Sequence, residues 1–368
     1  MQPARRAEVL RTTVREGATE AADCGQFRTA ALAAIADVVP YDGACLAMVD
    51  PATMLPTTGT TLGLGHARGI RLFVDLEYGP TPDSNSYADL AHTKRGIRGI
   101  WEACDGMPEH TTHYNELVRA LGMRDEVRMV FRGSDGRCWG YGSLMRAKER
   151  SFDDDDVDVL ARCLRDLGDG LRGTLLRQVP VELPPVPSGP AVVIVDGHNE
   201  IEIATPQALE HLDRLQAEPN RLPDRFMPAL AAVLRYRRFG ARTAVSRART
   251  ADGGWIVIRA GELDGDRVKG RIVVTLEPAQ PPAVVSLLAG LWGLTEREGD
   301  VLRALLAGRD RRAIARELSI SAYTVADHTR SIFLKADVGS RAELVANVLF
   351  GQYLPRTGQT VGPDGWFA

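Results

Sequence analysis

Near the C-terminus, residues 318–337 place polar side chains at spacings that could bind a nucleic acid. The stretch LSISAYTVADHTRSIFLKAD has apolar residues at helical spacing, with Ser321 at the position of an N-cap. On such a helix Ala326, Asp327 and Arg330 would project from an open face. An Arg can donate to a guanine edge, an Asp can accept from cytosine, and an Ala can contact a thymine methyl group. The stretch therefore predicts a helix whose outer face reads base pairs.

The same segment offers contacts to the phosphates of a DNA duplex. The free amides and the dipole at the N-terminus of a helix capped by Ser321 suit a phosphate. Thr324 lies on the first turn and could donate to another phosphate. His328 could donate to a phosphate or pack partly inward.

Short helices must position this segment, and capping residues mark where each one begins. The pattern Ser/Thr-x-x-Glu predicts a reciprocal capping box at Thr295–Glu298 and another at Ser340–Glu343, each contributing about 1 kcal/mol. Asp310 caps a helix that ends in a three-residue turn, 319–321, and Ser321 caps the next. Two helices joined by such a turn, the second with a polar face, form a helix-turn-helix. The sides of these helices that face the core are predicted from apolar steps of three and four residues: Val301, Leu302, Leu305, Leu306, Ile314, Ala315, Leu318, Val325, Ile332 and Ala336.

This part of the chain resembles the LuxR-type DNA-binding domain of bacterial transcriptional regulators. The matching residues run through nearly the whole domain with continuous spacing: Leu294, Thr295, Arg297, Glu298, Val301, Leu302, Gly308, Ile314, Ala315, Leu318, Ser321, Thr324, Val325, His328, Ile332, Lys335, Val338, Ser340, Arg341, Glu343 and Leu344. The resemblance implies an all-α, four-helix unit that dimerises through its last helix. It also implies that Lys335 and Arg341 lie near phosphates.

The segment departs from the family pattern in ways that affect binding. Ala313 stands where the family usually has Glu, and Ala336 where it usually has Leu, which leaves a smaller core. Residues 294–350 carry nine Lys and Arg against eight Asp and Glu. Because little net charge attracts the phosphates, we expect weak non-specific binding and reliance on dimerisation.

The whole chain has 368 residues, which is too long for one ordinary domain. Its hydrophobic fraction of 44% and charged fraction of 25% are typical of a folded soluble protein. No apolar run is long enough to cross a bilayer, and the charged N-terminus lacks the apolar core of a secretory signal. The five Cys are scattered, which fits a reducing cytoplasm and indicates no disulfide framework.

The pattern of elements predicts a multidomain α+β protein. We expect an α/β block with flanking helices over residues 1–178, a smaller α/β block over 190–280, the helical unit over 284–350, and a tail over 351–368. The segment VPVELPPVPSGP, residues 179–190, has five Pro and predicts an extended linker. In the first block, we expect a strand in GACLAMVD followed by a Thr/Gly-rich loop that continues to Gly69.

The first block resembles a GAF-type sensor domain and the second a PAS-type domain. The likeness to GAF rests on AALAAIADVVPYDGACLAMVD, GRCWGYGSLMRAKERSFDDDDVDVLARC and LGDGLRGTLL, and that to PAS on GPAVVIVDGHNEIEIATPQALEHL and the meander of 242–278. Both families hold small ligands or serve only as dimerisation and relay modules. Trp101, Tyr114, Met123 and Trp139 could line a ligand pocket in the first block, although they could also be ordinary core.

Two other motifs could indicate metal sites, but local structure accounts for them. His110 and His113 have no third ligand at a recognisable spacing. Asp153 to Asp156 stand at the start of a predicted helix, where carboxylates favour the dipole. We therefore expect no metal and no cofactor.

The sequence predicts a cytoplasmic bacterial transcription regulator that is not an enzyme. Its expected partners are double-stranded DNA, a second copy of the chain, and a small molecule bound by the N-terminal block, with no membrane. Two alternatives remain open: a dimeric sensor or adaptor that binds no DNA, and a metal-dependent hydrolase built on His110 and His113.

Overall fold

The computed structural model describes residues 2–64, 68–79, 85–147, 151–177, 189–215, 226–240, 244–250, 254–279 and 281–353. The chain divides into a larger unit that ends at Glu277 and a smaller one that begins at Pro278. Most of the predicted linker 179–190 and the tail from residue 354 lie outside the described residues.

The first sheet of the larger unit has five strands in the order β2-β1-β5-β4-β3. The pairs β1–β2, β1–β5, β4–β5 and β3–β4 are antiparallel. The strands are β1 (Gly43–Val49), β2 (Pro56–Leu62), β3 (Ile97–Gly99), β4 (Asp125–Arg132) and β5 (Cys138–Arg146). The strands β4 and β5 follow one another in the chain and form a hairpin.

The prediction of a loop from residue 51 to Gly69 is wrong, because residues 56–62 form the edge strand β2. Its Thr residues are β-branched and favour a strand. They are also buried against a polar partner on α2 (Cys24–Val38), where Arg28 donates to Thr60 at 3.1 Å and to Thr58 at 3.5 Å. Since the Thr residues of β2 and their partner Arg28 are all polar, the hydropathy pattern of residues 56–62 did not indicate a strand.

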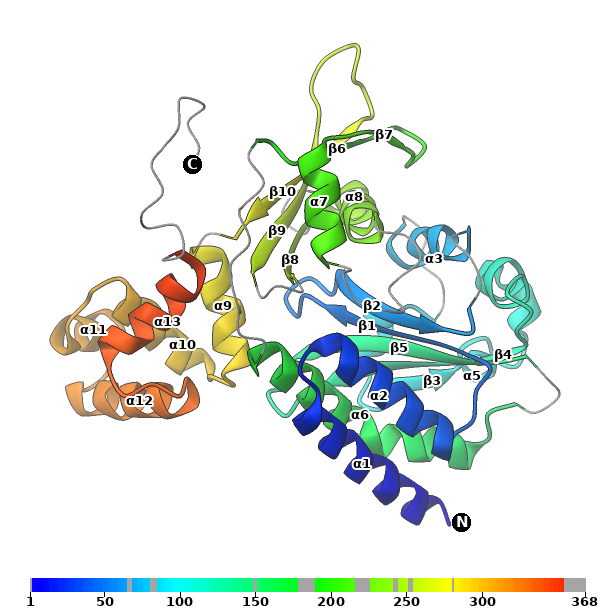
Figure 1. Cartoon of the computed structure of the whole chain (residues 1–368), viewed down its shortest axis with the longest axis horizontal. Coiled ribbons are helices and arrows are strands. Elements are labelled where there is room, and N and C mark those ends of the chain that lie inside the picture. Colours follow the sequence, from blue (N-terminus) through cyan, green and yellow to red (C-terminus); the bar gives the residue numbers. More distant parts are fainter. Residues whose placement is uncertain are drawn as a thin grey trace. The chain divides into compact units, whose positions relative to one another are not determined.

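Three helices cover one face of this sheet (Figure 1): α1 (Pro3–Glu20), α2, and the 24-residue α6 (Asp154–Arg177). Ion pairs hold α1 on α6. Arg6 contacts Asp156 at 2.5 Å, and Arg11 and Arg15 contact Asp166 at 2.8 and 2.7 Å. Asp156, the last residue of the Asp run, is therefore paired with a cation of the protein itself.

A glycine lets α6 approach the β4–β5 hairpin closely. A Cβ atom built on Gly168 would lie 2.6 Å from the backbone carbon of Arg132 and from the backbone nitrogen of Gly133. Backbone atoms cannot move aside as a flexible side chain can. Any larger residue at position 168 would therefore push α6 away from the sheet.

The opposite face of the sheet carries short helical segments. They are α3 (Arg68–Tyr78), α4 (Tyr87–His92), α5 (Ile100–Ala103), a 3₁₀ turn (Pro108–His110) and a π-helical turn (His113–Val118). The strand β3 and the π-helical turn were not predicted.

The second sheet has the order β7-β6-β10-β9-β8, and the pairs β6–β7, β6–β10 and β8–β9 are antiparallel. Its strands are β6 (Val192–Val195), β7 (Ile201–Ala204), β8 (Val245–Arg249), β9 (Trp255–Glu262) and β10 (Ile272–Pro278). Its helices are α7 (Pro206–Leu215) and α8 (Met227–Phe239).

The two sheets share a hydrophobic core within the larger unit. Leu55, Val74 and Tyr78 of the first block are buried in the cluster that contains the apolar residues of β6, α8 and β9. The carboxylate of Asp50, 1% exposed, accepts from the guanidinium of Arg247 at 2.7 and 2.8 Å. The regions resembling GAF and PAS domains are therefore packed as one body.

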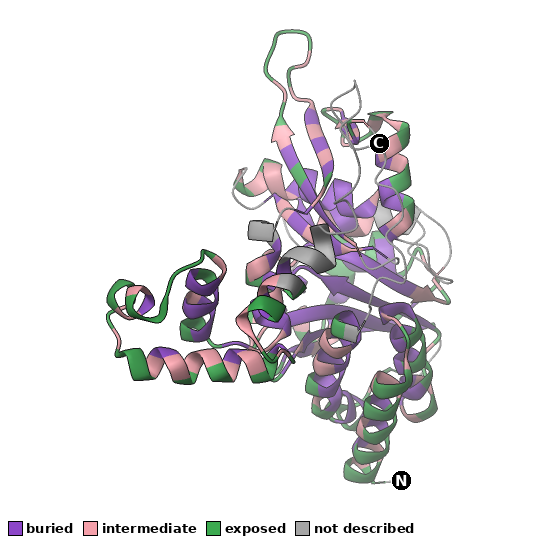
Figure 2. Ribbon diagram, turned by 60° about the vertical axis from the view of Figure 1, so that its left-hand side comes forward, coloured by how far each residue is buried: buried purple, intermediate pink, exposed green. Residues whose placement is uncertain are grey.

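The smaller unit is helical. It contains α9 (Pro281–Leu291), α10 (Glu296–Leu306), α11 (Arg311–Glu317), α12 (Ala322–Lys335) and α13 (Arg341–Tyr353). Figure 2 shows that buried residues follow the inner sides of its helices, while exposed residues follow the outer sides. In the described part of the chain, no helix is both long and apolar enough to cross a membrane.

Candidate nucleic-acid interface

The segment from α11 to α12 forms two helices joined by a short turn. The carboxylate of Asp310 accepts from the Ala313 amide at 2.8 Å and so caps α11, and the Ser321 hydroxyl accepts from the Thr324 amide at 3.0 Å and caps α12. Between the helices, Ser319 has a φ of 55°, a left-handed conformation that turns the chain sharply. The local capping and turn chemistry thus builds the predicted helix-turn-helix.

The inner side of α12 packs on the other helices. Val325 and Ile332 are 1% and 0% exposed, and Ile314 of α11 is 0% exposed. The cluster that they join comprises Ala289, Leu294, Val301, Leu302, Ala304, Leu305, Ile314, Val325, Ile332, Ala336 and Leu344. Leu306, Ala315 and Leu318 are only partly buried against it, although the sequence predicts them to face inward.

The outer side of α12 carries a stripe of four side chains one or two turns apart. Tyr323, Arg330 and Leu334 are 76%, 78% and 77% exposed, and Asp327 lies between them. Arg330 contacts Asp327 loosely, at 3.8 Å. An exposed ion pair of this length contributes little to stability, so its guanidinium can leave Asp327 at low cost.

Glu298 of α10 fixes the position of α12. Its carboxylate accepts from the Thr295 amide at 2.7 Å to complete the capping box, from the Ser331 hydroxyl at 2.5 Å, and from the Lys335 ammonium at 2.7 Å. Burial alone would raise the pKa of Glu298, but these hydrogen bonds outweigh it and lower the pKa to about 2. The carboxylate therefore stays ionised. It connects the start of α10 to α12 through these hydrogen bonds.

Several residues predicted to contact phosphate have partners within the unit. Lys335 is paired with Glu298, and Arg341 donates to the backbone carbonyl of Leu305 at 2.6 Å. The hydroxyls of Ser321 and Thr324 lie 2.8 Å apart, so one of them donates to the other.

The second predicted capping box is only half formed, because the Glu343 carboxylate accepts from the Gly339 amide at 2.6 Å.

The remaining predicted residues lie on or beside the open face. Asp327 and Arg330 are exposed, whereas Ala326 and His328 are half-buried at its edges. Ser321 is the N-cap of α12, and Thr324 lies on the first turn of this helix. Lys335 and Arg341 lie toward the neighbouring helices.

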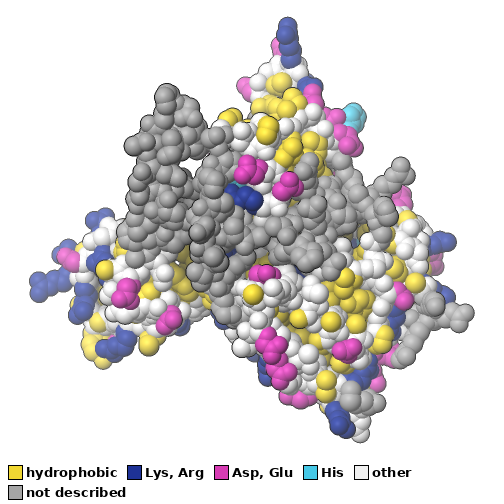
Figure 3. Space-filling view, in the orientation of Figure 1, with side chains coloured by type: hydrophobic (Ala, Val, Ile, Leu, Met, Phe, Trp, Pro, Cys, Tyr) yellow, Lys and Arg dark blue, Asp and Glu magenta, His cyan; other side chains and the backbone are white. Residues whose placement is uncertain are grey.

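The sequence analysis missed two kinds of residue on this surface. Tyr323 and Leu334 share the stripe with Arg330, at i−7 and i+4, and helical spacing alone could have found them. A second signal was the density of Arg in GRDRRAIARE, since Arg309, Arg311, Arg312 and Arg316 are all exposed on or next to α11. Figure 3 shows Lys and Arg side chains gathered over this part of the helical unit, with Asp and Glu among them.

Three of the four residues predicted to line a ligand pocket lie together. Tyr114 and Met123 are buried in one cluster, and Trp101 packs against it with its ring 6.3 Å from that of Tyr114. Trp139 does not join that cluster, and its indole donates to Asp135 at 3.2 Å. The indole nitrogen of Trp101 is buried and has no hydrogen-bond partner among the described residues.

A buried polar network occupies the same face of the first sheet. Arg128 of β4, 1% exposed, contacts Glu77 at 3.3 Å and Glu126 at 3.2 Å, and it donates to the backbone carbonyl of Asn85 at 2.7 Å. Glu126 also lies 2.5 Å from the ring nitrogen Nε2 of His113. Burial alone would raise the pKa of Glu126, but Arg128 and His113 outweigh it and lower the pKa to about 2.

The two His of the HxxH motif are not arranged as a metal pair. His113 is buried with Glu126 and Arg128, whereas His110 is exposed on the 3₁₀ turn. Among the residues that the structure describes, no group of three or more His, Cys, Asp or Glu is placed to hold a metal ion.

The helical unit matches a known family. Residues 293–348 fit the model of the bacterial regulatory proteins of the luxR family, also named GerE. The match covers α10 to α12 and most of α13, which carry the interface, and less than half of the chain. No curated protein matches the chain.

Solved structures show only distant likeness. SdiA of Escherichia coli is 14% identical, over 94% of this chain and 97% of its own, with a TM-score of 0.32. VqmA of Vibrio cholerae is 19% identical, over 46% of this chain and 85% of its own, with a TM-score of 0.19. The bacteriophytochrome RpBphP3 of R. palustris is 10% identical, over 74% of this chain and 63% of its own, with a TM-score of 0.32.

Proposed function

We propose that this protein is a DNA-binding regulator of transcription, and that α12 binds in the major groove of a specific DNA site. The observation that carries the proposal is the exposed stripe of α12, centred on Arg330, within a domain that matches the luxR family. The major groove is wide enough to admit one α-helix.

The side chains of the stripe have distinct roles in this proposal. Arg330 donates to the O6 and N7 atoms of a guanine, and Asp327 accepts from the amino group of a cytosine. Tyr323, Ala326 and Leu334 present apolar atoms to thymine methyl groups. Tyr323 and Leu334 flank the charged pair of Asp327 and Arg330. This arrangement favours a DNA site that contains both G·C and A·T base pairs.

Phosphate contacts come from the residues around the stripe. Ser321, Thr324 and His328 border the N-terminal half of α12, and the four exposed Arg near α11 flank it. Lys335 and Arg341 contact phosphate only if the duplex competes with their present partners, Glu298 and the carbonyl of Leu305. Since nearly balanced charge gives weak non-specific attraction, most of the affinity must come from groove contacts and from a second subunit.

The working form is a homodimer in this proposal. Two copies of α12 reach half-sites about 34–36 Å apart on one side of the duplex. The larger unit then controls binding, since a small molecule or partner protein that favours one pairing of the subunits changes whether both α12 helices can bind at once.

Replacing Arg330 with Ala is expected to lower affinity for the cognate site about 10- to 100-fold, because one bidentate guanine contact contributes roughly 1–3 kcal/mol. The cognate site is first obtained by genome-wide mapping of DNA bound by the wild-type protein. Affinity for the recovered fragment is then measured by fluorescence anisotropy for both proteins.

The matched control is Arg119→Ala, which removes the same charge from an exposed position of the larger unit. It should bind the fragment as the wild type does. If Arg330→Ala binds every mapped fragment with unchanged affinity, α12 does not read the groove. If neither protein enriches any DNA, the alternative of a dimeric adaptor that binds no DNA is favoured.

A further inference from the structure

The larger unit contains a cavity that the proposed DNA-binding role does not use. It lies between α1, α6 and the segments that flank β3 and β4, and its volume is about 590 Å³. Pockets of roughly 300–1,000 Å³ are typical of small-molecule sites. The cavity is therefore large enough for a ligand the size of a nucleotide.

The charge of its lining is strongly positive. Six cationic side chains line the cavity against two carboxylates, those of Glu8 and Asp166. The six are Arg11, Lys94, Arg95, Arg132, Arg162 and Arg165. Such an excess of positive charge in one concavity attracts anions.

Three of the six cations are engaged by the protein itself. Arg11 contacts Asp166 at 2.8 Å, and Arg95 contacts Asp158 at 2.9 Å. Arg132 donates to two backbone carbonyls, of which that of Thr93 lies at 2.8 Å. These side chains therefore have partners within the protein in the absence of a ligand.

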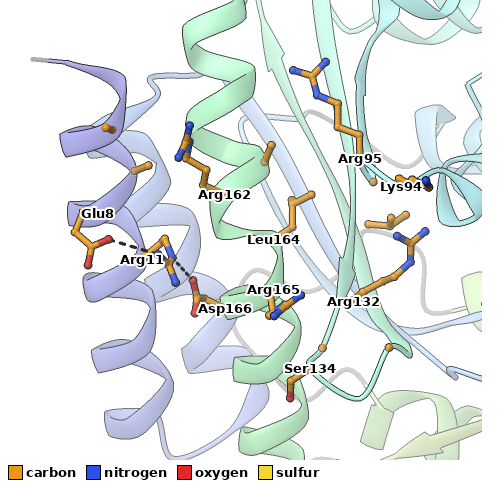
Figure 4. A pocket seen from close by; sticks show the side chains of 17 residues that line it. Glu8, Arg11, Lys94, Arg95, Arg132, Ser134, Arg162, Leu164, Arg165 and Asp166 are labelled. Atoms are coloured by element: carbon orange, nitrogen blue, oxygen red, sulfur yellow. Dashed lines mark hydrogen bonds and ion pairs between the residues drawn. The ribbon is translucent and has the colours of Figure 1, made fainter.

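The other three cations, Lys94, Arg162 and Arg165, have no hydrogen-bond or ion-pair partner among the described residues. All three are exposed. Figure 4 shows Arg165 on the side of α6 that faces the sheet, where Arg132 lies opposite it. Lys94 and Arg95 also lie on the sheet side, and Arg162 projects from α6 toward α1. Unpaired cations on two walls of one cavity suit a ligand with more than one anionic group.

The floor of the cavity is apolar and fixed. Leu164, Val130 and Ala7 are 7%, 1% and 2% exposed, and Gly96 and Gly133 belong to the same lining. A ligand that combines anionic groups with a less polar body can therefore contact both the floor and the charged walls.

We propose that this cavity binds a phosphorylated small molecule that carries at least two negative charges, such as a nucleoside diphosphate. A DNA duplex fits less well, because the site is concave. The ligand would connect α1, α6 and the β4 edge of the sheet. The proposal does not depend on DNA binding, since every residue belongs to the larger unit.

The test is isothermal titration calorimetry of the full chain with ADP, with inorganic pyrophosphate, and with citrate. The double variant Lys94→Ala with Arg165→Ala removes one unpaired cation from each wall. We expect saturable binding of ADP or pyrophosphate to the wild type, and at least tenfold weaker binding to the double variant, because charge-assisted hydrogen bonds are strong. Hydrogen exchange of α1 and α6 should slow when ADP is added to the wild type.

The matched control is Arg119→Ala with Arg124→Ala, which removes two exposed cations outside the cavity. Its affinity should stay within about twofold of the wild type, since these charges lie outside the site. Three results would overturn the proposal: no saturable binding of either phosphate probe, an equal loss in the control, or tighter binding of citrate than of both phosphate probes. Without ligand, the double variant should bind DNA as the wild type does. This test can therefore fail or succeed independently of the test of the proposed function.

Discussion

Replacing Arg128 with Met is expected to lower the free energy of unfolding of the larger unit by about 3–5 kcal/mol. The substitution keeps an unbranched apolar side chain but removes the cation between Glu77 and Glu126, which are 3% and 1% exposed. Two carboxylates would then share a buried site without the cation that lies between them. Thermal and urea unfolding followed by circular dichroism measure the loss.

The control for this prediction is Arg124→Met, one residue before β4 begins at Asp125. Arg124 is exposed, so its replacement should change stability by less than about 0.5 kcal/mol. The double variant Arg128→Met with Glu126→Gln should recover part of the lost stability, because it also removes the buried negative charge of Glu126. Equal stability of Arg128→Met and wild type would show that the buried network is not a source of stability.

Replacing Glu298 with Ala is expected to destabilise the helical unit by about 2–4 kcal/mol. The change removes the capping box with Thr295 and leaves Ser331 and Lys335 of α12 without their acceptor. Hydrogen exchange of the full chain, measured by mass spectrometry on peptides that cover residues 295–340, reports the stability of this unit separately.

The same carboxylate predicts a dependence on pH. Its pKa in the folded state is about 2, below the usual 4.5, so the stability that it contributes is complete above about pH 4.5. That contribution is lost as the pH falls from 4.5 towards 2, and the variant Glu298→Gln should lack this component.

Glu296→Ala is the matched control for the second prediction, because Glu296 is an exposed carboxylate on the first turn of the same helix. Its loss should cost no more than about 1 kcal/mol. Fast exchange throughout residues 295–340 of the Glu298 variant alone would support the role of this residue. Equal exchange in both variants would contradict it.

Local chemistry explains why the helical unit was predictable. Thr295, Asp310 and Ser321 act on amides three residues away, so their effect does not depend on the rest of the fold. Helical periodicity then identified Val325 and Ile332 as core. The same periodicity placed Arg330 and Asp327 outside.

What the sequence did not reveal depends on contacts between distant residues. The hydrogen bonds of Glu298 to Ser331 and Lys335 span more than thirty positions, so Lys335 could not be recognised as part of an internal ion pair. In the larger unit, β2 was hidden because its Thr residues pack on Arg28. The charged cavity brings together residues from positions 4 to 166, none of which forms a local motif.

The core shared by the two sheets bears on how the protein can be dissected. A fragment that stops near residue 178 would leave Leu55, Val74 and Tyr78 uncovered and would deprive Asp50 of Arg247. It would also free the last turn of α6, where Arg249 donates to the carbonyl of Leu175 at 2.7 Å. Such a truncated chain would expose apolar surface and tend to aggregate. Recombinant expression should therefore keep residues 1–277 together.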